Sequence, residues 1–300
     1  MLREVPTHTT GKDTTWPRHR LIRCSRRSRI SEPAGKLGTA QSSRSSGAHQ
    51  STTSCQRLPQ DFPETPGTDQ TLETIVSALG QSCGYADEQD GRLYHNTRPV
   101  QGEEFRAENT GSVEFEFHTG NVHHPFRPDY LILIGLRVDH DRQARTRIAE
   151  GAHAVYLLTE DDLEILQQPS SISGFPSSFT RGDGIARKTH PHQVLRQTTD
   201  RWYLRFNSHT TKGVDDRSQQ AAENLIAALE SVSEDIELTP GDIVVVDNHC
   251  AAHGRTPFAP RYDGIDRWLK RSFAISGAPA WARWNNQTVF PHCLELIDSL

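Results

Sequence analysis

Short apolar runs separated by long polar loops constrain this 300-residue chain more than any other feature of its sequence. Over residues 113–117 the apolar Val113, Phe115 and Phe117 alternate with acidic residues. A period of two residues is typical of a strand with one buried face. Five further apolar runs of strand length predict strands at residues 130–138, 154–158, 202–206, 243–246 and 269–275.

Helical periodicity is confined to a few segments. Apolar residues recur at intervals of three and four over residues 72–79, and Gly80 then provides a stop signal. Thr159 and Asp162 have the spacing of a capping box at the start of a second helix. The second and third predicted helices cover residues 159–168 and 216–232. Many short strands with few helices predict a mainly β fold with helical decoration, of the β-sandwich or jelly-roll type.

Residues 1–60 differ from the rest of the chain in composition and charge. They contain 11 Lys and Arg residues against 3 Asp and Glu residues, whereas the remaining residues contain 22 against 35. Few large apolar residues accompany the Ser, Thr and Arg residues here, so this segment cannot bury enough surface to offset the entropy lost on ordering. We therefore expect residues 1–60 to be a flexible or surface-draped basic extension, with a partner-binding arm or an over-long start of the sequence as the alternatives, and residues 61–300 to form one folded domain.

The composition excludes several classes of protein. The longest apolar stretch, residues 131–136, is far shorter than the roughly 20 residues that a membrane span needs. The five cysteines are odd in number and include no Cys-x-x-Cys pair, which argues against a disulfide scaffold or a zinc ribbon and favours a reducing, cytoplasmic location. The excess positive charge lies outside the folded domain, so a nucleic-acid polymer is not expected as a partner.

Two of the 15 histidines have a context that suggests a metal site. His118 stands at the end of the alternating strand, and His253 follows the apolar strand at residues 243–246. Mononuclear non-haem iron sites use two histidines and one carboxylate on one face of the metal. The carboxylate normally lies two residues after the first histidine, but no histidine of this chain is followed at that spacing by Asp or Glu. Gly120 occupies that position after His118.

The segments around these histidines resemble a known family. Residues 118–131, which read HTGNVHHPFRPDYL, resemble the first metal motif of the clavaminate synthase and asparagine/arginine hydroxylase family of iron(II)- and 2-oxoglutarate-dependent enzymes. Residues 241–255 and 261–271 are similar to the second motif. The resemblance covers about residues 70–280. It implies a double-stranded β-helix core, which is a cupin-like jelly roll, with His118 and His253 as iron ligands.

Gly120 separates this chain from the usual family pattern, which has Glu or Asp at that position. In this respect the chain resembles the iron halogenases, in which a missing carboxylate lets a halide bind the metal. Glycine supplies neither a ligand nor a charge, and a chloride ion would supply both. The resemblance implies an oxidoreductase in which O2 converts 2-oxoglutarate to succinate and CO2 while chloride replaces hydrogen on an unactivated carbon.

Other interpretations of Gly120 stay open. The chain could be an inactive relative that only binds ligands. A water molecule could fill the position and leave a hydroxylase. A carboxylate could also be recruited from elsewhere in the sequence, and Asp139, Asp141 and Asp247 are the candidates.

Two rival metal sites are also considered. His123 and His124 are alternative ligands, although the family resemblance makes His124 a structural residue. Cys250 and His253 have the spacing of half a zinc site, but the sequence contains no second pair to complete it.

Two residues are expected to hold 2-oxoglutarate. Arg267 lies 14 residues after His253, which is the family's spacing, and a guanidinium suits the distal carboxylate of this cosubstrate. Thr146 lies 28 residues after His118 and matches the family's threonine that touches 2-oxoglutarate.

Four further residues are expected to contact the substrate. Arg271 matches the arginine that grips the carboxylate of free amino acids in the family, and Asn109 matches a side chain that holds the amino-acid head group. Phe105 replaces a polar residue, and Asn207 stands where a substrate-binding Asp is usual. The loss of that Asp removes a counter-charge for an ammonium group, and Phe105 offers a flat surface for stacking.

These differences favour a freestanding, anionic, aromatic substrate. The chain here resembles the nucleotide-chlorinating halogenases of nucleoside-antibiotic biosynthesis, so the first hypothesis is chlorination of an adenine deoxynucleotide. A free amino acid is the alternative substrate, and hydroxylation is the alternative reaction. No docking helix for an acyl-carrier protein is apparent, so a carrier protein is not expected.

Overall fold

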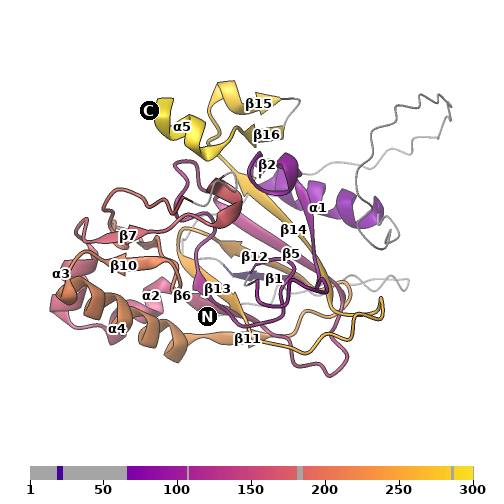
Figure 1. The fold of residues 1–300 in the computed structure, drawn as a ribbon, viewed down its shortest axis with the longest axis horizontal. Coiled ribbons are helices and arrows are strands. Elements are labelled where there is room, and N and C mark those ends of the chain that lie inside the picture. Colours follow the sequence, from indigo (N-terminus) through magenta and orange to yellow (C-terminus); the bar gives the residue numbers. More distant parts are fainter. Residues whose placement is uncertain (1–18, 23–65, 107, 181–184, 285–286, 300) are drawn as a thin grey trace, which may run out of the picture.

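The chain folds into two β-sheets with helices on their outer faces (Figure 1). The structure is a computed structural model, and it describes residues 19–22, 66–106, 108–180, 185–284 and 287–299. The larger sheet follows the order β1 (His19–Ile22), β12 (Ile243–Asp247), β5 (Tyr130–Arg137), β14 (Trp268–Ile275), β2 (Gln81–Tyr85), β16 (Gln287–Phe290) and β15 (Arg283–Trp284), and β3 (Tyr94–Thr97) also pairs with β14. The smaller sheet follows the order β11 (Glu234–Ile236), β6 (Thr146–Glu150), β13 (Ala251–Arg255) and β4 (Phe115–His118).

Shorter elements surround the two sheets. Two ribbons pair β7 (Ser171–Ser173) with β10 (Thr211–Gly213) and β8 (Leu195–Gln197) with β9 (Trp202–Leu204). The α-helices are α1 (Pro66–Leu79), α2 (Gly151–Ala154), α3 (Glu160–Leu166), α4 (Asp216–Val232) and α5 (Cys293–Ser299). The 3-10 turns are η1 (Gln89–Gly91), η2 (Val155–Leu157), η3 (Ser177–Thr180) and η4 (Ala280–Ala282). No helix within the described ranges has both the length and the apolar character that a membrane span requires.

The main core lies between the two sheets. Leu131 and Leu133 of β5 and Val246 of β12 pack in one cluster with Ile148 of β6 and Ala251 of β13. Successive residues of a strand point to opposite faces, so alternate residues of β5 turn inward to this cluster. The burial of apolar surface between the sheets therefore fixes the position of the smaller sheet, which carries His118 and His253.

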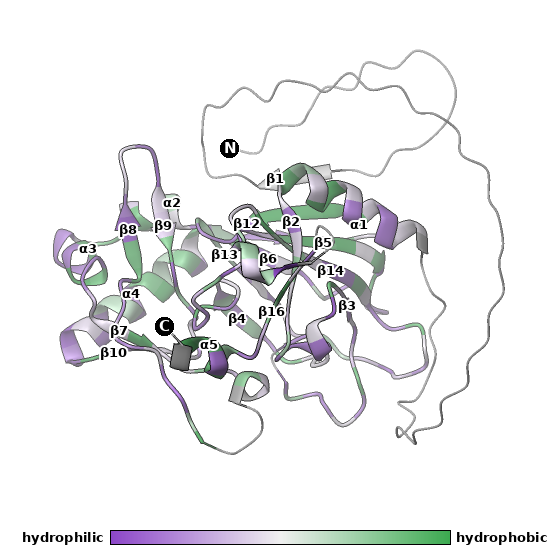
Figure 2. Cartoon of the chain, turned by 90° about the horizontal axis from the view of Figure 1, so that it is seen from above, coloured by the Kyte–Doolittle hydropathy of each residue, from purple (hydrophilic) through white to green (hydrophobic). Residues whose placement is uncertain are grey.

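The other face of the larger sheet is covered by α1. Ile132 and Ile134 of β5 pack in a second cluster with Leu72 and Val76 of α1. Because β5 is apolar on both faces, it appears in the sequence as a continuous run and lies inside the molecule. Figure 2 shows the apolar colouring of β5 and β12 beneath α1.

The outer face of the smaller sheet is covered by α4 (Figure 1). Leu225 and Leu229 of α4 pack against Ala149 of β6, Ala252 of β13 and Phe117 of β4. The small side chains of the two alanines let the helix approach the strands closely. The smaller sheet is thus held on both faces, which keeps the ends of β4 and β13 in fixed positions.

Most elements expected from the sequence are confirmed. The three predicted helices correspond to α1, α3 and α4, and the capping box at Thr159 is present, because its hydroxyl accepts a hydrogen bond from Asp162 N at 3.1 Å. The predicted strand at residues 154–158 is wrong, because this segment forms the end of α2 and the turn η2. Val155 is buried there against α4, and a five-residue apolar run does not distinguish a strand from a helical turn.

One part of the basic N-terminal segment belongs to the larger sheet. β1 pairs with β12 in parallel, with His19 opposite Ile243 and Ile22 opposite Val246. The rest of the segment predicted to be a flexible extension lies outside the described residues. The mainly β class with helical decoration is confirmed for the folded domain.

Buried neutral histidines give the fold a pH dependence. Burial lowers the pKa values of His95, His124 and His192 to about 4. Histidines in the unfolded chain have a pKa of about 6.5, so between about pH 6.5 and 4 the unfolded chain binds more protons than the folded protein. Stability therefore rises with pH across this window and is lost on acidification.

Urea unfolding should show a lower free energy of unfolding at pH 5.0 than at pH 7.5, by on the order of 1 kcal/mol for each buried histidine. An equal or higher free energy of unfolding at pH 5.0 would contradict this.

Candidate metal centre

The pairing of β4 with β13 brings together two histidines that are far apart in the sequence. His118, the last residue of β4, lies directly opposite His253 in this antiparallel pair. The centroids of the two imidazole rings are 4.2 Å apart, and the rings are tilted by 52°. Metal–nitrogen bonds to histidine are about 2.1 Å long, so rings this close can direct one nitrogen each at a common ion.

The hydrogen bonds of His118 leave one of its nitrogens available. His118 Nδ1 donates to the carbonyl of Glu116 at 2.9 Å, which leaves Nε2 as the unprotonated nitrogen of the neutral ring. The ring of Phe115 stacks on His118, with centroids 3.8 Å apart and a tilt of 27°. The hydrogen bond and the stacking together hold the imidazole in one orientation.

His253 is also held in the neutral form. Its Nδ1 is buried and has no hydrogen-bond partner among the described residues. Burial lowers the pKa of His118 to about 4, and burial together with the nearby His118 lowers the pKa of His253 well below its usual value. Neutral imidazole is the form that binds a metal, so a buried nitrogen without a partner at this place fits a metal ligand.

Gly120 lies at the position where the family pattern has a carboxylate. Its N–H donates to Asn248 Oδ1 at 2.5 Å, and Asn248 Nδ2 donates to the carbonyls of Gly120 at 3.1 Å and Pro128 at 2.8 Å. The backbone φ of Gly120 lies outside the left-handed range, so its conformation does not require glycine. A Cβ built on Gly120 would have three atoms of the Asn248 side chain as its nearest neighbours, the first at 3.2 Å. A side chain would thus demand a shift of a few tenths of an ångström from Asn248.

None of the carboxylates proposed as substitutes reaches the two histidines. Asp139 accepts the N–H groups of Gln143 and Ala144 at 2.8 and 3.0 Å. Asp141 pairs with Arg261 at 2.9 Å, and Asp247 pairs with Arg201 at 3.0 Å. These three carboxylates bind other partners, so none of them supports the interpretation that a carboxylate from elsewhere in the sequence completes the metal site.

No other described His, Cys, Asp or Glu side chain joins the two histidines as a third ligand. Among the described residues, the one group of three or more His, Cys, Asp or Glu ligand atoms within 4.8 Å of one another is His140, Asp263 and Asp266. This group contains neither His118 nor His253. Cys250, His123 and His124 therefore do not complete a three-ligand site with the pair, which removes the rival sites considered from the sequence.

His123 and His124 instead belong to an aromatic cluster. The ring of His123 lies 4.3 Å from that of Phe179, and the ring of His124 lies 4.7 Å from that of Tyr85 in an edge-on arrangement. His124 Nδ1 accepts the N–H of Phe126 at 3.0 Å. These contacts agree with a structural role for His124.

The two residues expected to hold 2-oxoglutarate lie side by side. Arg267 Nη2 donates to Thr146 Oγ1 at 3.4 Å, and both side chains are buried. Burial and the neighbouring charge of Arg255 lower the pKa of Arg267 to about 9. Phe258 packs under both guanidinium groups, at 5.9 Å from Arg267 and 5.5 Å from Arg255. Two buried cations close to each other fit an anionic ligand.

Arg255 was not assigned a role from the sequence, although it follows His253 by two residues. It lies opposite Thr146 in the pairing of β13 with β6, and its Nη2 donates to the carbonyl of Val113 at 2.7 Å. Residues two apart in a strand point to the same face, so the spacing between His253 and Arg255 could have identified Arg255 from the sequence.

The four residues expected to contact the substrate do not all come together. Arg271 and Asn109 both donate to Glu88, the latter at 3.4 Å. Asn207 forms an isolated bridge with His118, but its Oδ1 accepts N–H groups of its own turn. The side chain of Phe105 is 90% exposed, so the structure does not bring it to the site as a stacking surface.

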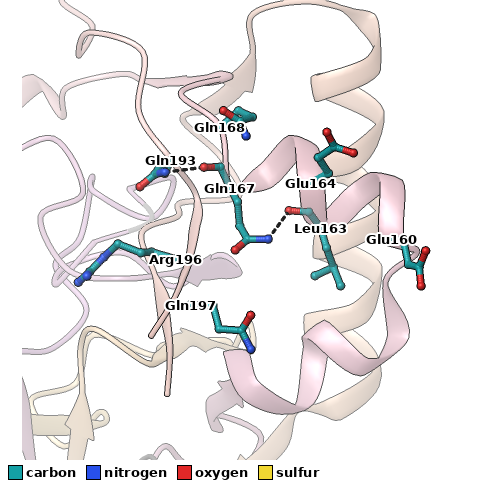
Figure 3. Close-up of a pocket in the computed structure, with 8 residues that line it drawn as sticks. All are labelled: Glu160, Leu163, Glu164, Gln167, Gln168, Gln193, Arg196 and Gln197. Atoms are coloured by element: carbon teal, nitrogen blue, oxygen red, sulfur yellow. Dashed lines mark hydrogen bonds between the residues drawn. The ribbon is translucent and has the colours of Figure 1, made fainter. Parts of the chain in front are cut away.

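A surface hollow lies in a different part of the molecule (Figure 3). Its lining residues come from α3 and the residues directly after it, such as Glu160 and Gln168, and from residues 193–197. Gln193 donates to the carbonyl of Gln167 beside it. Neither histidine of the pair lines this hollow, so the two features are separate.

The fold and the histidine pair belong to a known class of protein. Residues 60–273 match the family described as "Taurine catabolism dioxygenase TauD, TfdA family", and the chain belongs to that family. The chain is 34% identical over 206 residues to the L-asparagine oxygenase of Streptomyces coelicolor, a match that covers 68% of this chain and 61% of the relative. It is 30% identical over 195 residues to clavaminate synthase 2 of Streptomyces clavuligerus, which covers 65% and 60%. The chain thus spans about 60% of the length of these curated relatives.

Solved structures agree with this assignment. Asparagine oxygenase in complex with Fe(II), 3-hydroxyasparagine and succinate matches with a TM-score of 0.69 and 31% identity, over 74% of this chain and 69% of that one. The non-haem iron oxygenase OrfP with Fe, succinate and hydroxyarginine matches with a TM-score of 0.66 and 27% identity, over 78% and 75%. The predicted family and its jelly-roll core are confirmed. The asparagine oxygenases and OrfP are described as oxygenases, so chlorination and a nucleotide substrate stay predictions.

Asn248 should be important for stability as well as for the position of Gly120. Asn248→Ala removes three buried hydrogen bonds and leaves the N–H of Gly120 and two carbonyls without this partner. We expect a loss of about 1–3 kcal/mol in the free energy of unfolding, measured with urea. Asn224→Ala is the control, because the side chain of Asn224 is only partly buried on α4, where it donates to Asp162 at 3.0 Å and accepts from Gln220 at 3.2 Å. Equal losses for the two variants would refute the structural role of Asn248.

Proposed function

We propose that this protein is an iron(II)- and 2-oxoglutarate-dependent halogenase, which replaces a hydrogen on an unactivated carbon of a small polar molecule with chloride. The observation that carries the proposal is Gly120. Gly120 follows the proposed ligand His118 by two residues, where the family pattern has a carboxylate, and its backbone conformation does not require glycine. Asn248 packs closely against it, but a small shift of that side chain would make room for a Cβ. We therefore attribute the missing side chain to an open ligand position, which a carboxylate would otherwise fill and make negative.

The residues present fit an iron ion. His118 and His253 would hold it through neutral imidazole nitrogens, and the buried Nδ1 of His253 has no other partner among the residues described. When bound, iron and 2-oxoglutarate would supply the oxidising power, with conversion of 2-oxoglutarate to succinate and CO2. The protein's own contribution is to hold the ligands and the target C–H group in place.

Electrostatics around the pair favour an added anion. The charges that act on the His118 imidazole are those of Arg271 and Arg255, and both lower its pKa. Arg271 acts on His253 in the same way. Among the described residues, no carboxylate oxygen lies close enough to both histidines to act as a third ligand. Chloride at the Gly120 position would supply the negative charge that a carboxylate would otherwise bring.

Arg267 and Thr146 would bind the distal carboxylate of 2-oxoglutarate. Arg267 is buried and offers a planar pair of donors, and its neighbour Thr146 adds a hydroxyl donor. The second cation, Arg255, adds attraction for a ligand with two negative charges.

A hydroxylase is the second candidate, and the relatives support it. Their printed names include L-asparagine oxygenase and L-ornithine/L-arginine 3-hydroxylase. If water instead of chloride fills the Gly120 position, the same residues would support hydroxylation. The two candidates differ in one measurable property, which is the atom that replaces hydrogen in the product.

The substrate class has two candidates. The relatives' names favour a free amino acid. The hypothesis of an adenine deoxynucleotide substrate rests on the resemblance to nucleotide-chlorinating halogenases. The exposure of Phe105 weakens one argument for it, which was stacking of the base on this ring. Both are freestanding small molecules, so neither needs a carrier protein, a membrane or a nucleic-acid polymer.

Product analysis tests the proposal directly. The purified protein would be incubated with Fe(II), 2-oxoglutarate, O2, chloride and a pool of amino acids and nucleotides, and the products measured by mass spectrometry. We expect one component to gain the mass difference between chlorine and hydrogen, with the chlorine isotope pattern, and to gain bromine when bromide replaces chloride. A product that gains one oxygen atom with either halide would identify a hydroxylase instead.

Restoring a carboxylate should remove the halide position. Gly120→Asp introduces a ligand and a negative charge, so chlorination should fall to background, with hydroxylation or no product left. Gly120→Ala is the matched control, because it introduces the same Cβ beside Asn248 without the charge. Chlorination by Gly120→Asp at the rate of the unaltered protein would show that Gly120 is not beside the metal. Thermal unfolding of both variants separates loss of folding from loss of the site.

A further inference from the structure

Two loops lead into the residues expected to hold 2-oxoglutarate. One loop, residues 138–145, joins β5 to β6, and Thr146 is the first residue of β6 directly after it. The other loop, residues 256–267, joins β13 to β14, and Arg267 is its last residue, directly before β14. Contacts between the two loops therefore act on how Arg267 is placed against Thr146, with which it is in contact.

The turn at residues 261–266 is closed by the carboxylate of Asp266. Its Oδ1 accepts the N–H of Arg261 at 2.7 Å, and its Oδ2 accepts the N–H of Tyr262 at 2.6 Å. The backbone φ of Tyr262 is 56°, in the left-handed region, where a residue with a large side chain is strained. Asp266 thus holds a strained turn closed directly before Arg267.

His140 ties this turn to the loop between β5 and β6. Its Nε2 donates to Asp263 Oδ1 at 3.2 Å and lies 3.5 Å from Asp266 Oδ1. The side chains of His140 and Asp266 keep only 13% and 11% of their surface exposed, so solvent screens this contact little. Both carboxylate oxygens also accept backbone N–H groups, that of Ile265 at 3.0 Å in the case of Asp263. The group of His140, Asp263 and Asp266 is therefore a hydrogen-bonded link between the two loops.

Arg137, the last residue of β5, adds a second tie. Its Nη1 donates to the carbonyl of Gly264 at 2.6 Å and to that of Asp266 at 3.5 Å. Arg137 also lies opposite Trp268 in the pairing of β14 with β5, and its guanidinium is 5.8 Å from the centre of the indole ring. The backbone of Arg267 is thus held from both sides, by the turn before it and by the strand after it.

The side chain of Arg267 depends on this support. Its hydrogen bond to Thr146 is 3.4 Å long, which is beyond the usual range for an N–H donor and an oxygen. The direction of the guanidinium is therefore set more by the backbone that carries it than by this contact. A guanidinium binds a carboxylate through two parallel N–H groups, so a small shift of the backbone weakens both hydrogen bonds at once.

We propose that Asp266, linked to His140, is a positioning residue for 2-oxoglutarate, which acts through the backbone of Arg267 and aims its guanidinium at the distal carboxylate. This inference rests on the proposed function, because that proposal places 2-oxoglutarate at Arg267 and Thr146. Asp266 itself touches neither the cosubstrate nor the metal. Its effect is confined to the end of the ligand that Arg267 holds.

The experiment compares two 2-oxo acids that differ only at the distal end. 2-Oxoglutarate ends in a carboxylate, whereas 2-oxopentanoate has the same chain length and ends in a methyl group. The protein is loaded with Fe(II) without oxygen, and calorimetry measures the dissociation constant of each acid. Their ratio reports the contact with the distal carboxylate, because a general loss of structure would weaken both acids alike. The unaltered protein should prefer 2-oxoglutarate about 100-fold or more, since the methyl group forms no charged hydrogen bond with Arg267.

Asp266→Ala should reduce this preference to about ten-fold or less. The loss should come from weaker binding of 2-oxoglutarate, while binding of 2-oxopentanoate stays within about two-fold. Asp141→Asn is the matched control, because Asp141 pairs with Arg261 across the same two loops but through exposed side chains, and exposed ion pairs contribute little. It should keep the full preference. Arg267→Ala is the reference variant and should remove the preference.

Two changes at His140 test the link between the loops without altering the turn itself. His140→Leu removes the N–H donor and should lower the preference in the same direction as Asp266→Ala. His140→Gln keeps a donor of similar reach and should restore most of it. These two variants also decide the matter if Asp266→Ala does not fold.

The outcomes separate this inference from the proposed function. Full preference in both Asp266→Ala and His140→Leu, together with its loss in Arg267→Ala, would overturn the inference alone. Equal weakening of both acids in Asp266→Ala would show a general structural role and would also overturn it. Full preference in Arg267→Ala would overturn the inference and the assignment of Arg267 together. Because no oxygen is present, these results do not depend on whether the product carries chlorine or oxygen.

Discussion

The pairing of β4 with β13 is the interaction on which the candidate site depends. It places His118 opposite His253 and so turns two residues from distant parts of the sequence into one pair of ligands. Apolar packing on both faces of the smaller sheet holds this pairing, with the inter-sheet core on one side and α4 on the other. Asn248 extends the arrangement, because its amide ties Gly120 to the end of β12. In the metal site that we propose, these hydrogen bonds would fix the backbone of Gly120 at the third ligand position.

Burial and charge act together around this pair. Burial keeps both imidazoles neutral, which prepares them for a metal ion. The charged groups acting on them are arginines, and each arginine has a specific environment: Arg267 contacts Thr146, whereas Arg271 is balanced by Glu88. No carboxylate among the described residues joins the two histidines as a third ligand, which is consistent with an added anion at the metal.

The sequence predicted the parts of this structure that local patterns or linear motifs encode. The alternation before His118, the apolar run of β5 and the periodicity of α4 identified their elements. The spacings that selected Thr146 and Arg267 identified two residues that the structure brings into contact. The segment at residues 154–158 failed because a short apolar run has no period of its own.

Residues that act through distant contacts could not be found in this way. Glu88 lies in a polar turn, and its hydrogen bond with Arg271, which is far away in the sequence, is not visible in any local pattern. Phe105 was expected to offer a stacking surface because it replaces a polar residue of the family pattern, and its side chain is exposed. Strand β1 was hidden for a related reason, because a four-residue strand in a basic segment depends on β12 as its partner.

The central claim is that an anion from solution, and not a side chain, completes the metal site next to Gly120. The most direct measurement is a crystal structure of the protein with Fe(II) and 2-oxoglutarate, grown without oxygen in bromide, with anomalous diffraction at the bromine edge. We predict an anomalous peak bonded to the metal ion held by His118 and His253, on the side of Gly120. An Asp or Glu oxygen or a water molecule at that position, or a metal bound away from the two histidines, would contradict the account.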